Sequence, residues 1–286
     1  MSRIIDTTLV SDVLIESCDA MAISKYAPLK IFAKDFSDKA ETYSNGKVKS
    51  ASIAFNSTEP TVSVNPTSFG NDDSTTVDNV KVDVNLLSVP IMADWSDNVS
   101  IKQHVQSALN ALIKKMVAQC TGLFTKTNFG TSKQITVDVD GADTLEKQRM
   151  LMKQLYKGTN SGINKYLIGD TDVYANALPS DANGFNLKSM NPAYGFDGVF
   201  ENSIWSDGVK GIVTDGRAVA MVARTVQWDE RLCLETEPIY IPELDLTVSL
   251  STWGDQDSRA IKGTLDIAFG AALYDKTATK VIVQGA

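Results

Sequence analysis

The chain has 286 residues, of which 43% are hydrophobic and 22% are charged, a balance that is typical of folded proteins and excludes a wholly disordered chain. Its 27 basic and 35 acidic residues give a formal net charge of −8, which disfavours tight nucleic-acid binding as the main function. Three widely separated cysteines, Cys18, Cys120 and Cys233, favour neither a disulfide framework nor a zinc site.

The first part of the chain predicts neither export nor membrane insertion. Charged residues interrupt the apolar ones between Met1 and Ser24, which excludes the continuous apolar core of a signal peptide. No later stretch approaches the roughly 18 apolar residues that a membrane span requires. We therefore expect synthesis in a cytosol and no membrane partner.

Residues 47–90 are predicted to form a long, hairpin-like arm. Apolar residues alternate with small or polar ones at both ends of this segment, at Ala51, Ile53 and Phe55 and again at Val80, Val82, Val84 and Leu86. Between them lies NPTSFGNDDSTT, residues 65–76, a run of turn formers. A two-stranded hairpin is marginal alone in water, so the arm needs a partner surface, either its own domain or a neighbouring subunit.

The strongest periodic signal predicts a long helix from Ser100 to Thr121. Apolar residues recur at steps of three and four, and we expect this helix to pack through Ile101, Val105, Leu109, Leu112 and Met116. Ser100 and Gln103 have the spacing of a capping box, and Gly122 is a natural stop. The polar side of the helix, which includes Lys102, Lys114 and Lys115, is more typical of a solvated face than of a ligand site.

The remainder of the chain divides into a mixed part and a strand-rich part. Strand and helix patterns alternate in the middle third, with strands at 134–139 and 165–169, helices at 143–157 and 171–178, and a loop at 180–197. The last third is mostly strand, at 211–213, 218–226, 238–241, 246–251, 261–273 and 280–283. We therefore expect a small α/β domain followed by a closing set of strands.

Familiar catalytic, metal and cofactor signatures are missing from the sequence. The single histidine, His104, lies inside the predicted helix, which argues against a Ser–His–Asp or Cys–His site. GTNSGINK, residues 158–165, lacks the spacing of a phosphate loop. A calcium loop centred on Gly141 would need Thr136 and Lys147 as its end ligands, which are the wrong residue types. We predict no catalytic, metal-binding or cofactor-binding residues.

One acidic cluster keeps an enzymatic alternative open. Paired carboxylates that could act as general acid and base occur at Glu235, Glu237, Glu243 and Asp245. Carboxylates that alternate along an edge strand are more often a solvated face. An enzyme would be expected to remain a small oligomer, so particle size separates this alternative from a shell protein.

The order of the predicted elements resembles that of a tailed-bacteriophage major capsid protein of the Hong Kong 97 type. These elements are a polar arm, a two-stranded extension, a long helix, a small α/β domain and a final set of strands. Two segments carry the resemblance, VKVDVNLLSVPIMADWSDNVSIKQHVQSALNALIKKM at residues 80–116 and GTLDIAFGAALYDKTATKVIVQ at residues 263–284. It implies an α+β fold with an N-terminal arm (1–40), an extended β-hairpin loop (41–95), a peripheral domain with a spine helix (96–125 and 228–286) and an axial domain (126–227).

The resemblance also implies a structural function without a reaction. Subunits would assemble as pentamers and hexamers into an icosahedral shell around the phage double-stranded DNA, in the virion, after synthesis in the host cytoplasm. The extended loop would contact a neighbouring subunit through Ile53, Phe55, Phe69, Asp72, Asp73, Val82 and Val84. Residues 50–80 contain no lysine, so we expect no lysine-mediated cross-link from this loop.

The partners implied are a separate scaffolding protein and a portal. Packaged DNA would be touched only weakly and without sequence preference, with Lys102, Lys114 and Lys115 as candidates for a basic surface facing the lumen. An encapsulin-like bacterial compartment shares the fold and differs in cargo. A tail or decoration protein is a further alternative, although such proteins are mostly β and the long helix counts against them.

Overall fold

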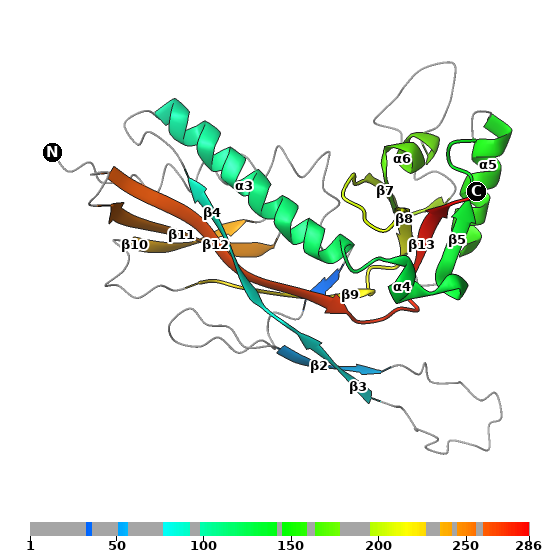
Figure 1. Ribbon diagram of the computed structural model, residues 1–286, viewed down its shortest axis with the longest axis horizontal. Helices are drawn as coiled ribbons and strands as arrows, with labels where there is room; N and C mark the ends of the chain where they lie inside the picture. Colours follow the sequence, from blue (N-terminus) through cyan, green and yellow to red (C-terminus); the bar gives the residue numbers. More distant parts are fainter. Residues whose placement is uncertain are drawn as a thin grey trace.

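The computed structural model describes residues 33–35, 51–56, 77–91, 98–141, 145–158, 164–177, 195–226, 235–241, 245–255 and 260–285. The helices of these residues are α3 (Asn98–Thr121), α4 (Lys126–Phe129), α5 (Leu145–Gly158) and α6 (Thr171–Ala177), with a 3-10 turn at Thr131–Lys133. The strands are β1 (Ala33–Asp35), β2 (Ala51–Asn56), β3 (Val77–Val82), β4 (Asn85–Ile91), β5 (Gln134–Val137), β6 (Tyr166–Gly169), β7 (Gly198–Glu201), β8 (Val209–Thr214), β9 (Val219–Arg224), β10 (Glu235–Ile241), β11 (Leu246–Asp255), β12 (Ala260–Leu273) and β13 (Thr279–Gln284). They build an elongated body in which a large sheet and a smaller sheet lie end to end (Figure 1).

Strand β12 is the centre of the large sheet. It pairs with β11 and β9 along one edge and with β4 along the other. Leu265 has partners in both β11 and β4, and Ala268 has partners in both β9 and β4, so β4 must lie on the opposite edge from β11 and β9. β10 extends the sheet beyond β11, and β1 pairs in parallel with β9. Alternate residues of β12, Leu265 and Ile267 among them, are fully buried and share a core with α3. Period-two alternation in the sequence thus becomes one apolar face that the long helix covers.

Helix α3 lies along this apolar face and ends before the smaller sheet (Figure 1). The side chains of Val105, Leu109, Leu112 and Met116 are fully buried, as the three- and four-residue spacing requires, and the side chain of Ile101 lies outside the described part of the structure. The helix begins at Asn98, two residues before the predicted start. It ends at Thr121, where the hydroxyl donates to the carbonyl of Val117 at 3.0 Å.

The smaller sheet has the strand order β5–β13–β8–β6–β7. Four of these strands run in the same direction, and β8 alone is antiparallel to its neighbours. α5 and α6 cover one face and share a core with Leu167, Val213 and Ile282. The other face, which includes Ile168 and Ile212, joins the core of α3 and α4. The sheet is thus enclosed on both faces, as is usual for mainly parallel sheets.

Two strands belong to different units from those that the sequence predicts. Residues 126–227 are expected to form the axial domain and 228–286 to return to the peripheral domain. Instead, β9 pairs with β12 in the large sheet, and β13 pairs with β5 and β8 in the smaller sheet. These two assignments are wrong because an alternating pattern identifies a strand but not its distant partner.

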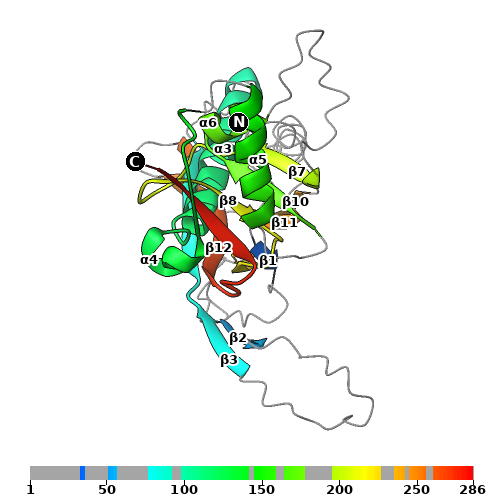
Figure 2. The same ribbon diagram turned by 90° about the vertical axis from the view of Figure 1, so that its right-hand side faces the viewer.

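The hairpin of β2 and β3 forms a separate two-stranded sheet on the side of the large sheet opposite α3 (Figure 1 and Figure 2). Its register places Ile53 opposite Val80 and Phe55 opposite Asp78. After Asp83 and Val84 the chain continues as β4 and pairs with β12. Strands 51–56 and 77–82 therefore match the predicted arm, whereas 85–91 are part of the large sheet and not of an extended loop.

Candidate functional site

The candidate catalytic and metal sites of the sequence are not assembled in the described part of the structure. No group of three or more His, Cys, Asp or Glu side chains there has the arrangement of a metal site. His104 is exposed on α3. None of the described helices is long and apolar enough to cross a lipid bilayer.

Of the acidic cluster at 235–245, the structure describes the side chains of Glu237 and Asp245, which lie at different positions along the chain of β10 and the turn that follows it. Glu237 lies within β10, opposite Leu250 of β11. It is four residues before Ile241, the last residue of β10. Asp245 lies beyond that end, is exposed, and accepts a hydrogen bond from the Tyr240 hydroxyl at 2.6 Å. Glu243 and the side chain of Glu235 lie outside the described residues.

The base of the β2–β3 hairpin is fixed by a close crossing over β12. A methyl group added at Gly270 would lie 2.4 Å from the Asp83 carbonyl oxygen and 3.0 Å from Val82 Cγ1. Only glycine leaves room for the backbone of the β3–β4 connection at this point. The hairpin is therefore anchored to the centre of the large sheet.

Val82 is covered within its own chain, so its side chain is not available to a neighbouring subunit, whereas the contact predicted for Val84 stays a prediction. Val82 is fully buried and packs with Ala220 and Val222 of β9, and Val84 is half-buried against the same small cluster. The alternation around Val82 indicates a strand but does not specify which layer covers its apolar face.

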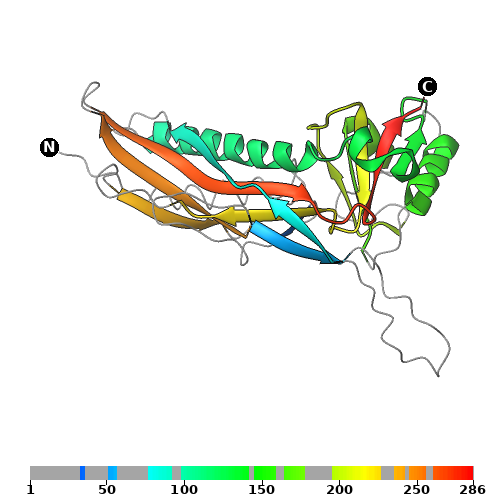
Figure 3. The same ribbon diagram turned by 60° about the horizontal axis from the view of Figure 1, so that its bottom comes forward.

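The other predicted contact residues of the arm lie further from the body or outside the described part. Ile53 and Phe55 lie in β2, whose only partner among the described strands is β3. Phe69, Asp72 and Asp73 fall outside the described residues. Figure 3 shows the hairpin beside the body, with β2 on its outer side. One exposed apolar residue near the hairpin is not predicted as a contact: Leu86 in β4 is 44% exposed.

The lysines of α3 differ in their surroundings. Lys114 is exposed. The Lys115 ammonium donates a hydrogen bond to the Ser88 carbonyl oxygen of β4 at 3.1 Å and so ties the helix to the strand that follows the hairpin. The side chain of Lys102 lies outside the described residues. Of the predicted basic surface, the structure therefore describes one free-standing lysine and one that holds two elements together.

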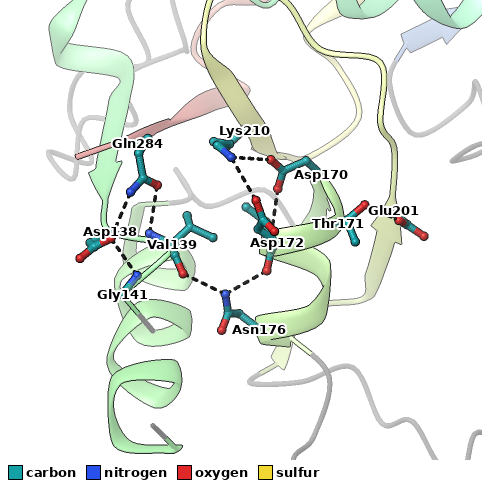
Figure 4. A network of polar contacts seen from close by, with 11 residues as sticks. Asp138, Val139, Gly141, Asp170, Thr171, Asp172, Asn176, Glu201, Lys210 and Gln284 are labelled. Atoms are coloured by element: carbon teal, nitrogen blue, oxygen red, sulfur yellow. Dashed lines mark hydrogen bonds and ion pairs between the residues drawn. The ribbon is translucent and has the colours of Figure 1, made fainter. Parts of the chain in front are cut away.

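A network of polar contacts joins the carboxyl ends of the parallel strands in the smaller sheet (Figure 4). Asp138 follows β5, and its carboxylate accepts hydrogen bonds from the Gly141 amide at 2.9 Å and from the side-chain amide of Gln284 at 3.0 Å. The side-chain oxygen of Gln284 accepts from the Val139 amide at 3.2 Å. Asp138 thus organises a turn, which explains why a calcium-like spacing surrounds Gly141 without a calcium loop.

The same edge of the sheet gathers further carboxylates. The Lys210 ammonium lies 3.2 Å from Asp170 and 3.1 Å from Asp172, and the Glu201 carboxylate accepts from the Thr171 hydroxyl at 2.8 Å. Hydrogen bonds to Asp172 and then to Asp170 raise the pKa of Lys210, so this lysine remains protonated. We call this surface the acidic rim; it comprises Asp138, Asp140, Asp170, Asp172 and Glu201. The sequence gives no signal for it because its members come from separate segments.

No protein-family model and no curated protein matches the sequence. The fold, in contrast, is similar to those of several solved particles over nearly the whole chain. A virus-like particle from Pyrococcus furiosus is similar with a TM-score of 0.54 and 13% identity, over 96% of this chain and 97% of the other. The capsid of cyanophage P-SCSP1u gives 0.52 and 11%, over 91% and 89%. The capsid of a native GTA particle gives 0.55 and 10%, over 91% and 90%.

At these identities the similarity concerns the fold. It extends over 91–96% of this chain and 90–97% of the similar chains. The chain has the Hong Kong 97-type capsid fold, as the resemblance implied.

Proposed function

We propose that this chain is the structural subunit of an icosahedral phage capsid and catalyses no reaction. The observation that carries the proposal is the similarity of the fold, over 91% of the chain, to two structures described as capsids. A fold can host unrelated functions, so the match is weighed together with the surfaces of this chain. Among the described residues, those surfaces offer a hairpin anchored at Gly270 beside an elongated body.

The hairpin provides a physical reason for assembly. β2 has one strand partner in the described part of the chain, and a two-stranded unit is marginal by itself in water. Its base is held rigidly at Gly270, while β2 lies on the outer side, where a neighbouring subunit can complete the missing layer. Ile53 and Phe55 of β2 are the apolar residues that we assign to this contact. Many such weak contacts around a closed shell add up through multivalency.

The domain names follow from the same proposal. The large sheet with α3 corresponds to the peripheral domain and the smaller sheet with α5 and α6 to the axial domain. β9 joins the former and β13 the latter, as the strand pairing requires. Residues 1–40 are proposed to be the N-terminal arm, part of which, β1, adds to the large sheet.

The proposed partners are further copies of the chain in pentamers and hexamers, a separate scaffolding protein, a portal and packaged double-stranded DNA. With a net charge of −8, a wall of these subunits would repel DNA on average and confine it rather than bind it tightly. Lys114 is the exposed cation of α3 that we assign to weak contact with DNA. The protein would then reside in the virion after synthesis in the host cytoplasm.

Deletion of residues 66–75, within the connection from β2 to β3, tests the role of the hairpin. The described core contains none of these residues, so we expect circular dichroism of the variant to match that of the wild type. Sedimentation velocity should show that the wild type forms large particles and that the variant does not. An unfolded variant, or one that assembles normally, would contradict the assignment of the hairpin as an inter-subunit contact.

A bacterial compartment shell is the second candidate, because one similar structure is described as a virus-like particle and not as a phage capsid. Both functions need the same shell, so particle formation does not separate them. Nucleic acid protected from nuclease inside particles made with the genomic neighbours of the chain supports the capsid. A protein cargo without protected nucleic acid supports the compartment.

A further inference from the structure

The outer face of α5 has no partner in the described part of the chain. α5 buries Leu151, Met152 and Leu155 against the smaller sheet. Its opposite face exposes Arg149, Met150, Lys153 and Lys157, and Met150 is 61% exposed. No ion pair within the described residues involves any of these three cations. Glu146 is also exposed on this side, so the face is basic but not purely so.

The acidic rim is complementary to this helix face. Five carboxylates there, at Asp138, Asp140, Asp170, Asp172 and Glu201, accompany a single bound lysine, Lys210. Asp140 and Asp172 are both exposed, and Lys210 is shared between Asp170 and Asp172. The rim therefore keeps an excess of negative charge that can attract cations from outside the domain.

The two surfaces lie on one domain, and no ion pair within the described residues joins them. α5 packs beside β5 and β8, whereas α6 and its carboxylates lie by β6 and β7 towards the other end of the sheet, as Figure 1 shows. α5 begins close to Asp138 and runs away from the rim, so that Lys157 is about 18 Å along the helix axis from Leu145. This distance exceeds the reach of a lysine side chain. Arg149 and Lys153 lie nearer to the start of the helix, but no ion pair within the described residues joins any of these three cations to the rim, so their charges remain available to a second copy.

We propose that the basic face of α5 in one subunit docks on the acidic rim of the next subunit. Such a contact is heterologous, because different surfaces of the same chain meet, and repetition about an axis closes a ring. The inference rests on the proposed shell function and deepens it by naming the two faces that bring the smaller domains together. Exposed Met150, beside the cations, favours a protein surface over the phosphate backbone of nucleic acid, which offers no apolar partner.

Charge reversal with reciprocal rescue tests the proposal. The first variant, Lys153→Glu/Lys157→Glu, makes the α5 face acidic; the second, Asp140→Lys/Asp172→Lys, makes the rim basic. All four side chains are exposed, so both variants should fold, which circular dichroism checks. Each variant alone should lose large particles in sedimentation velocity at physiological salt. A chain that carries all four changes should regain them, because its acidic helix face meets the basic rim of each neighbour in pentamers and hexamers alike.

A matched control carries the same change of charge outside both surfaces, Lys126→Glu/Lys276→Glu, at two exposed lysines, and should assemble like the wild type. Normal assembly of both test variants, or failure of the folded chain with all four changes to assemble, would overturn the proposed contact. If the α5 variant assembles normally but loses co-purified nucleic acid, the helix face binds nucleic acid instead, and the proposal is wrong. A wild type that never forms particles would overturn the shell function itself, which distinguishes the two failures.

Discussion

The crossing at Gly270 gives a sharp prediction about how the hairpin is held. Gly270→Ala adds one methyl group that would lie 2.4 Å from the Asp83 carbonyl oxygen, whereas ordinary contact begins at 3.4 Å. The neighbouring atom belongs to the backbone, so no flexible side chain can move aside. The connection between β3 and β4 must therefore shift by about 1 Å or the β12 backbone must distort, both of which are overpacking effects.

Overpacking of this kind costs about 1–3 kcal/mol of the free energy of unfolding. With a urea dependence of about 3 kcal/mol per M, the unfolding midpoint should fall by about 0.3–1 M. Urea unfolding of the purified subunit, followed by circular dichroism, measures the change. Because the displaced segment contains Val82, which packs against Ala220 and Val222, we expect the hairpin to be released from the large sheet before the rest of the subunit unfolds.

Gly285→Ala is the matched control, because a methyl group there would lie 3.5 Å from its nearest neighbour, the Val137 carbonyl oxygen. The control should unfold at the wild-type urea concentration. An unchanged midpoint for Gly270→Ala, together with normal assembly, would refute the reasoning that this crossing anchors the hairpin.

Two further predictions concern α3. Leu112→Asp places a charge at a fully buried position and should leave no folded subunit. Its control, Lys114→Asp at an exposed position, should change the free energy of unfolding by less than about 0.5 kcal/mol. A native circular dichroism spectrum for Leu112→Asp would contradict the packing of this helix. Burial raises the pKa of the Cys120 thiol from 9.0 to about 12. The folded state therefore retains a proton that the unfolded state loses above pH 9. The free energy of unfolding should fall by up to about 1.4 kcal/mol per pH unit between pH 9 and pH 12. Comparison of urea unfolding at pH 8 and pH 10 between the wild type and Cys120→Ala isolates this contribution, and equal losses in both proteins would show that the thiol does not cause it.

Local patterns predict the elements of this fold well where the side chains themselves set the period. The long helix is predicted to within two residues at its start and ends at the predicted residue, because its apolar side chains must all meet one sheet. The strands at 246–255 and 260–273 are likewise recognisable from alternation. β7 is missed because its four residues, GVFE, follow a stretch rich in Gly, Asn and Pro, and its parallel pairing with β6 is non-local.

Long-range relations could not be predicted from the same patterns. The sequence of β13 indicates a strand, but its partners β5 and β8 lie more than sixty residues earlier in the chain. The acidic rim depends on the parallel order of four strands, whose ends bring Asp138, Asp170 and Glu201 to one edge. Val82 shows the same limit, since alternation around it does not reveal which of the two possible surfaces, its own sheet or a neighbour, will cover it.

Electron microscopy of the purified chain, alone and coexpressed with its genomic neighbours, tests the central claim most directly. We expect closed icosahedral particles, or sheets and rings of pentamers and hexamers, from the full-length protein. Only small, discrete particles in both preparations would contradict the shell function and return attention to the acidic residues of β10, with Glu237 as the first to replace.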